Sequence, residues 1–92
     1  MKRYIQSGRL LKLSEWGEVL QYAKELAAKA SKDFGVDVRA SVYTMYDGAK
    51  GISFKVYDSD GNFYQEYNSG IQSSVADYKR ALQRCYNWVR TV

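Results

Sequence analysis

Tyrosine and basic side chains are the residues of this chain whose chemistry most suggests a function. The 92 residues include nine tyrosines, fourteen lysines and arginines, ten acids and no histidine. Three of the tyrosines fall in the stretch VYDSDGNFYQEY, residues 56–67. Tyrosine rings stack on nucleic-acid bases and fill protein interfaces, and lysine and arginine bind phosphates or acidic side chains. These residue types therefore predict binding rather than catalysis.

Side chains that could catalyse a reaction or hold a metal are few. Without histidine, the chain lacks the commonest general base and metal ligand. Cys85 falls on the apolar stripe of the last predicted helix, which indicates a structural cysteine. The segment DSDGN, residues 58–62, resembles the start of a calcium-binding loop, but its glycine comes fourth where that loop needs it sixth. We therefore predict no enzyme activity, no cofactor and no metal site.

Two helices are predicted, one near each end of the chain. From Trp16 to Ala30, apolar residues recur at spacings of three and four. Ser14 is a suitable N-cap for this helix, and Gly35 is a suitable residue for ending it. Ser74 is the predicted N-cap of the second helix. The apolar stripe of that helix comprises Val75, Tyr78, Leu82, Cys85 and Val89.

Between the helices, the apolar period changes to two, which predicts strands in residues 36–45, 52–57 and 62–67. A two-residue turn at Asp60-Gly61 would set Tyr57 opposite Tyr64 and Lys55 opposite Glu66. A meander of three strands cannot bury its inner face alone, so both helices should cover that face. We expect an α+β fold in the order α-β-β-β-α, with a three-stranded antiparallel meander and two helices packed on one face. The other face of the sheet would be bare.

The length predicts one domain, residues 1–92, in which residues 1–13 form a basic N-terminal arm or a short extra strand. Residues 1–12 and 79–92 each carry four basic residues and no acid. If the two ends meet, they form a basic patch; the alternative is that the C-terminal cations complement the helix dipole. A single cysteine and the lack of a long apolar run predict a cytoplasmic protein without a membrane span.

The bare sheet face and the basic C-terminal helix supply the predicted binding residues. They are Arg39, Tyr43, Lys55, Tyr57, Tyr64, Lys79, Arg80 and Arg84. We expect a non-catalytic module that engages nucleic acid or a nucleoprotein complex through these side chains. The alternative is an inhibitor that binds a host protein through its tyrosine-rich surface. A homodimer formed through a free sheet edge or the bare face is a third expectation, and in the plainest interpretation the tyrosines only pair strands.

Three resemblances bear on this choice. The element order over residues 14–90 is similar to the double-stranded-RNA-binding domain, although SSVADYKR lacks the lysine cluster that opens that family's last helix. The segment GISFKVYDSDGNFYQEYNSGIQSSVADYKRAL resembles the arm-type DNA-binding domain of phage integrases, although Gln65 and Glu66 stand where that family's sheet is basic. Both resemblances imply nucleic-acid binding. A small tyrosine-rich α+β chain without catalytic residues also resembles phage inhibitors of the anti-CRISPR and anti-restriction type, which implies a protein target.

Overall fold

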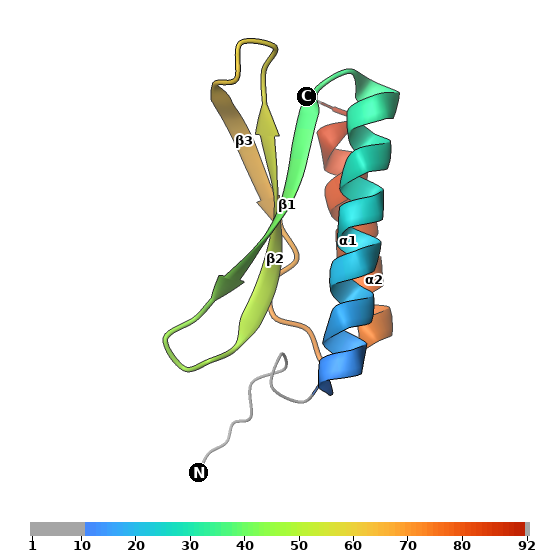
Figure 1. Cartoon of the computed structure of the whole chain (residues 1–92), viewed down its shortest axis with the longest axis vertical. Coiled ribbons are helices and arrows are strands. Elements are labelled where there is room, and N and C mark those ends of the chain that lie inside the picture. Colours follow the sequence, from blue (N-terminus) through green and yellow to red (C-terminus); the bar gives the residue numbers. More distant parts are fainter. Residues whose placement is uncertain (1–10, 92) are drawn as a thin grey trace.

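The computed structural model describes residues 11–91. Helix α1 (Leu13–Phe34) is followed by β1 (Asp37–Thr44), β2 (Lys50–Tyr57), β3 (Phe63–Asn68) and α2 (Val75–Val89). The strands form an antiparallel sheet in the order β1-β2-β3, and both helices lie on one face of it (Figure 1). The predicted α+β fold is confirmed. The predicted basic arm or extra strand in residues 1–13 lies mostly outside the described residues, and its last residue, Leu13, begins α1.

Helix α1 begins earlier than the sequence predicts. Its N-cap is Lys12, whose backbone N–H donates to Glu15 Oε1 at 2.9 Å. The prediction of Ser14 as the N-cap is wrong. The Glu15 side chain accepts a hydrogen bond from the N–H of Lys12, so the helix begins closer to the N-terminus. At the other end, Gly35 adopts φ +70° and its N–H donates to the Ser31 carbonyl at 3.0 Å, so the predicted end of the helix is confirmed.

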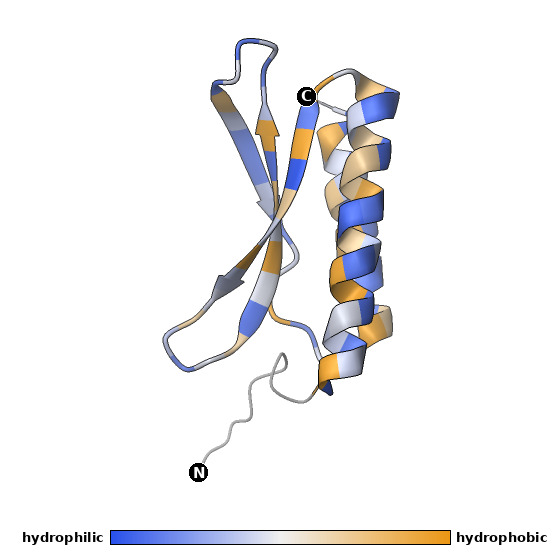
Figure 2. Ribbon diagram, in the orientation of Figure 1, coloured by the Kyte–Doolittle hydropathy of each residue, from blue (hydrophilic) through white to orange (hydrophobic). Residues whose placement is uncertain are grey.

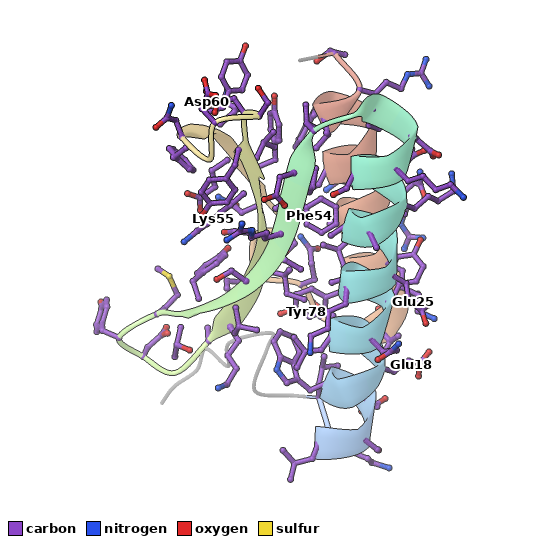
Figure 3. The ribbon with its side chains drawn as sticks, turned by 45° about the horizontal axis from the view of Figure 1, so that its top comes forward. Glu18, Glu25, Phe54, Lys55, Asp60 and Tyr78 are labelled. Carbon is purple, nitrogen blue, oxygen red and sulfur yellow. The ribbon has the colours of Figure 1, made fainter. Side chains whose placement is uncertain are left out.

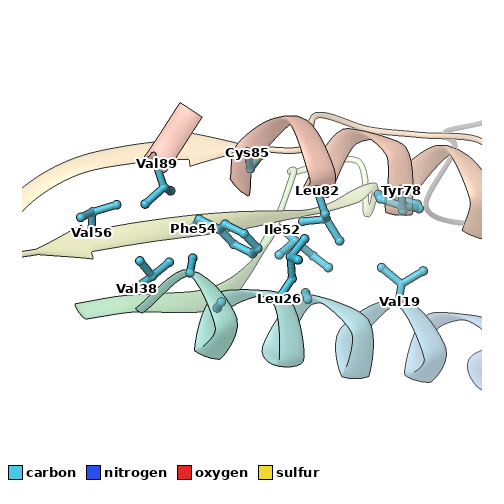
Figure 4. Close-up of a cluster of buried hydrophobic side chains, with 13 residues drawn as sticks. Val19, Leu26, Val38, Ile52, Phe54, Val56, Tyr78, Leu82, Cys85 and Val89 are labelled. Atoms are coloured by element: carbon cyan, nitrogen blue, oxygen red, sulfur yellow. The ribbon is translucent and has the colours of Figure 1, made fainter. Parts of the chain in front are cut away.

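The core lies between the sheet and the two helices (Figure 4). Hydrophobic and hydrophilic residues alternate along β1, so one side of the strand faces the helices (Figure 2). Tyr78 and Cys85 of α2 are fully buried, as the predicted apolar stripe requires. Burial raises the pKa of the Cys85 thiol to about 11, which leaves it protonated and unreactive at neutral pH. The buried cluster comprises Val19, Ala23, Leu26, Ala27, Ala30, Val38, Ile52, Phe54, Val56, Tyr78, Leu82, Cys85 and Val89.

The hairpin between β2 and β3 turns through three residues rather than two. The N–H of Asp58 donates to the carbonyl of Asn62 at 3.0 Å, and the Asp58 carboxylate accepts from the N–H groups of Asp60 and Asn62, each at 2.9 Å. Gly61 closes the turn at φ +84°. Gly48 takes the same role at φ +93° in the hairpin between β1 and β2. The predicted two-residue turn is therefore one residue too short.

This longer turn changes the pairing of the tyrosines. Lys55 lies opposite Glu66, as predicted, but a β-bulge interrupts the ladder nearer the turn. Beyond the bulge, Tyr57 lies opposite Phe63, and Tyr64 is the extra residue of β3. The predicted Tyr57–Tyr64 pair is wrong, because the extra turn residue moves β3 by one position there.

Neither helix in the described part of the chain combines the length and the apolar character needed to cross a bilayer.

Candidate binding surface

The face of the sheet turned away from the helices carries the candidate surface. In a strand, successive side chains alternate between the two faces. Phe54 therefore points toward the helices, and its neighbour Lys55 points to the opposite side (Figure 3). Two rows of paired residues on this side form what we call the outer-face patch. Its members are Asp37, Tyr57 and Phe63 in one row, and Arg39, Lys55 and Glu66 in the next.

An arginine and two aromatic rings form the centre of the outer-face patch. The Arg39 guanidinium lies over the Tyr57 ring, 4.7 Å from its centroid, and Arg39 Nη2 is 2.8 Å from Asp37 Oδ2. Hydrogen bonding to Asp37 raises the pKa of Arg39. The Tyr57 ring meets Phe63 edge to face, with centroids 5.9 Å apart. Phe63 is 56% exposed and its neighbour Tyr64 is 59% exposed, so aromatic surface reaches solvent here.

The charges of the outer-face patch balance. Arg39 and Lys55 contribute +2, and Asp37 and Glu66 contribute −2, which sums to zero. Glu66 Oε2 accepts a hydrogen bond from Ser53 Oγ at 2.8 Å. Lys55, although opposite Glu66, forms no ion pair with any described residue. Its ammonium group is therefore available to an external partner.

Tyr43 points to the same side of the sheet but serves the fold. Its side chain is half-buried and its ring lies over Gly51, where an added Cβ would sit 2.3 Å from the Tyr43 Cζ. Burial raises the pKa of Tyr43, and a hydrogen bond to the Gly70 backbone acts in the opposite direction. Tyr43 was predicted as a binding residue, and the structure places it apart from the outer-face patch.

The predicted basic residues of α2 belong to the other layer of the molecule, since α2 packs on the helix-covered face. Lys79 Nζ lies 2.8 Å from Glu18 Oε2, and Arg80 Nη2 lies 2.5 Å from Asp77 Oδ1. Arg84 is exposed and has no ion pair within residues 11–91. The structure therefore brings Arg39, Lys55 and Tyr57 together, with Tyr64 in the adjoining bulge, and does not join them to the three α2 cations. The basic N-terminus, apart from Lys12, lies outside the described residues.

Phe63 is the aromatic member of the outer-face patch that was not predicted from the sequence; the acids Asp37 and Glu66 were also absent from the predicted binding residues. The turn chemistry carried a usable signal, because an aspartate at position 58 can accept hydrogen bonds from the N–H groups that follow it. A three-residue turn ending at Gly61 sets Tyr57 opposite Phe63. The position of Phe63 opposite Tyr57 could therefore have been predicted from the turn residues.

No pocket is found in the described part of the chain, and no group of three or more histidine, cysteine, aspartate or glutamate side chains there could hold a metal ion. Comparisons of the chain with protein-family models, with curated proteins and with solved structures find no match. The surface chemistry is therefore the basis for any functional conclusion.

Proposed function

We propose that this chain is a non-catalytic binding module whose outer-face patch docks onto another protein. The observation that supports the proposal is the exposed aromatic surface of Phe63 beside the stacked pair of Arg39 and Tyr57. Tyrosine, phenylalanine and arginine are enriched at the centres of protein interfaces. This choice favours a protein partner over the nucleic-acid partner that the sequence first suggested.

The electrostatics of the patch support a protein partner. A phosphate backbone approaching Arg39 and Lys55 would also meet the carboxylates of Asp37 and Glu66, so little net attraction remains. A protein surface can match both signs, with an acidic group for Lys55 and an apolar area for Phe63. Arg39 is already held by Asp37 and Tyr57, which lowers the entropy lost when a partner binds it.

Nucleic acid is the second candidate, favoured by the exposed Arg84 and by the unpaired ammonium group of Lys55. Arg84 belongs to the helix layer and Lys55 to the sheet. A single nucleic-acid strand would therefore have to bind to one of these two layers alone. Fluorescence anisotropy with labelled single-stranded and duplex DNA and RNA, between about 50 and 200 mM salt, tests this candidate. Submicromolar binding that weakens steeply with salt would favour nucleic acid over the proposed protein partner.

The protein proposal is tested by capture with matched variants. Phe63→Ser and Tyr64→Ser remove exposed aromatic area near the patch, whereas Tyr46→Ser removes a fully exposed aromatic side chain from the other hairpin. We expect one protein, retained from nuclease-treated extract of cells that make this chain, to be lost with the first two variants and kept with the third. The resemblance to phage inhibitors adds cytoplasmic host defence proteins to the partners that the capture should screen. Equal retention by all three variants would contradict the proposal.

A further inference from the structure

The outer edge of β1 carries backbone groups that the sheet does not use. In an antiparallel pair, alternate residues direct their N–H and C=O groups toward the neighbouring strand, and the residues between direct them away. Ile52 uses both groups toward Ser69, on the β3 side. Its β1 partner, Val42, therefore forms no hydrogen bond with β2 and directs its N–H and C=O outward. By the same alternation, the outward-directed residues of β1 are Val38, Ala40, Val42 and Thr44.

Helix α1 supplies a hydrogen-bond partner for the outward backbone groups of one of these four residues and for none of the other three. The N–H of Val38 donates to Ser31 Oγ at 2.8 Å, and Ser31 Oγ donates to the Val38 carbonyl at 3.3 Å. Within residues 11–91, no hydrogen bond is formed by the outward groups of Ala40, Val42 or Thr44. Figure 1 shows why: β1 lies beside α1 near its first residues and diverges from the helix along its length. We call residues 40–44 the open edge.

The open edge lacks the devices that usually prevent strands from pairing. Sheets protect their edges with charged residues, proline or β-bulges. The other edge strand, β3, has the β-bulge and carries Glu66. The open edge reads ASVYT, which contains no charge and no proline, and its ladder with β2 is regular. Val42, on the helix-facing side, is 40% exposed although it is apolar.

We propose that a second copy of this chain pairs with the open edge, antiparallel, with the two-fold axis at Val42. The register follows from the free groups. Val42 lies opposite the partner's Val42, and Ala40 lies opposite the partner's Thr44, so every outward N–H and C=O of the open edge gains a hydrogen bond. The capped Val38 falls beyond the paired segment, and Arg39 falls opposite the partner's Met45, so no like charges meet.

This inference does not depend on the proposed function. The two-fold axis stands perpendicular to the sheet, so both outer-face patches lie on the same side of one continuous sheet. The interface consists of one strand edge and the Val42 side chains, and interfaces of that size are weak. We therefore expect association that depends on concentration, with half of the chains paired between about 10 μM and about 1 mM.

Amide hydrogen exchange followed by NMR at low and high protein concentration tests the register residue by residue. The amides of Ala40, Val42 and Thr44 should exchange fast in dilute protein and several-fold more slowly in concentrated protein. The amides of Ser41 and Tyr43 serve as internal controls, because they bond to β2 and should exchange slowly at both concentrations. Equally fast exchange of Ala40, Val42 and Thr44 at both concentrations would overturn the proposal.

Sedimentation of Val42 variants provides the second test. Val42→Pro removes an N–H that forms no hydrogen bond with any residue of 11–91, and proline is tolerated at such edge positions. Val42→Lys sets two ammonium groups face to face at the axis and is the alternative if the proline variant does not fold. Both folded variants should sediment as monomers, whereas Val42→Thr should associate like the wild type. The proposed interface would be contradicted if the Val42→Lys variant associated as strongly as the wild type. It would also be contradicted if the Phe63→Ser variant, changed outside the open edge, no longer associated.

Discussion

Replacing Tyr78 by phenylalanine tests how the end of the sheet is held to the helices. The Tyr78 side chain is fully buried, its hydroxyl donates to the Lys50 carbonyl at 2.6 Å, and its ring packs edge to face on Trp16, with centroids 5.3 Å apart. β3 ends before it can pair with this part of β2, so the Tyr78 hydroxyl takes the place of a strand partner for Lys50. Phenylalanine keeps the ring contact and removes only the hydroxyl.

The expected cost follows from the carbonyl that is left without a partner. An unsatisfied buried polar group costs about 1–3 kcal/mol; the Tyr78–Lys50 hydrogen bond is partly buried, so Tyr78→Phe should lower the free energy of unfolding by about 2 kcal/mol. For a domain of 60–100 residues, about 1 kcal/mol corresponds to about 4–8 °C in melting temperature. We therefore expect a melting temperature about 10 °C lower, with the same native circular-dichroism spectrum.

Urea denaturation measures this loss against a matched control. Tyr22→Phe also removes one hydroxyl, but that group is exposed and its bond to Gln83 Oε1 is long, 3.5 Å, so its loss should cost no more than about 0.5 kcal/mol. Unfolding of the Tyr78 variant at a clearly lower urea concentration, with an unchanged slope, would support the reasoning. Equal stabilities of the two variants would refute it.

Three further experiments test the core and the sheet. Gly51→Ala should lower stability by about 1–3 kcal/mol in urea denaturation, because the new Cβ displaces the Tyr43 ring; an unchanged midpoint would contradict that packing. Cys85 should resist alkylation at pH 8 in the native protein, since its thiol pKa is raised to about 11 by burial, and should react rapidly in urea. Leu82→Asp should abolish the native circular-dichroism spectrum because the charge enters the core, whereas Val75→Asp, at a half-buried position, should leave a folded but less stable domain. A cooperatively folded Leu82→Asp variant would show that the core is assigned incorrectly.

The element order could be read from the sequence because each element carries its own period. The spacing of apolar residues marked both helices, and Gly35 correctly ended the first. The start of α1 was less predictable, because Ser14 and Glu15 both offer capping chemistry and the helix uses the glutamate. The turn after β2 was misread for a similar reason: the backbone prefers the hydrogen bonds of the Asp58 carboxylate to a tighter turn at Asp60-Gly61.

The candidate surface was only partly predictable, because strand register decides which side chains meet. Lys55 and Tyr57 were assigned to the bare face from the alternation of β2. The stacking of Arg39 on Tyr57 needed the pairing of β1 with β2, and the contact with Phe63 needed the correct turn length. The ion pair of Lys79 with Glu18 joins two helices that are far apart in the sequence, so the sequence could not show that this cation is neutralised.

Site-specific photo-crosslinking in cells can show whether the outer-face patch binds a protein. A photoreactive phenylalanine analogue at position 63 lies in the patch, and the same analogue at Ala28, an exposed position of α1, is the control. In cells that make this chain, we predict a discrete, nuclease-resistant protein adduct from position 63 and none from position 28. The same adduct from both positions, or a nucleic-acid adduct from position 63 in place of a protein, would contradict the proposed function.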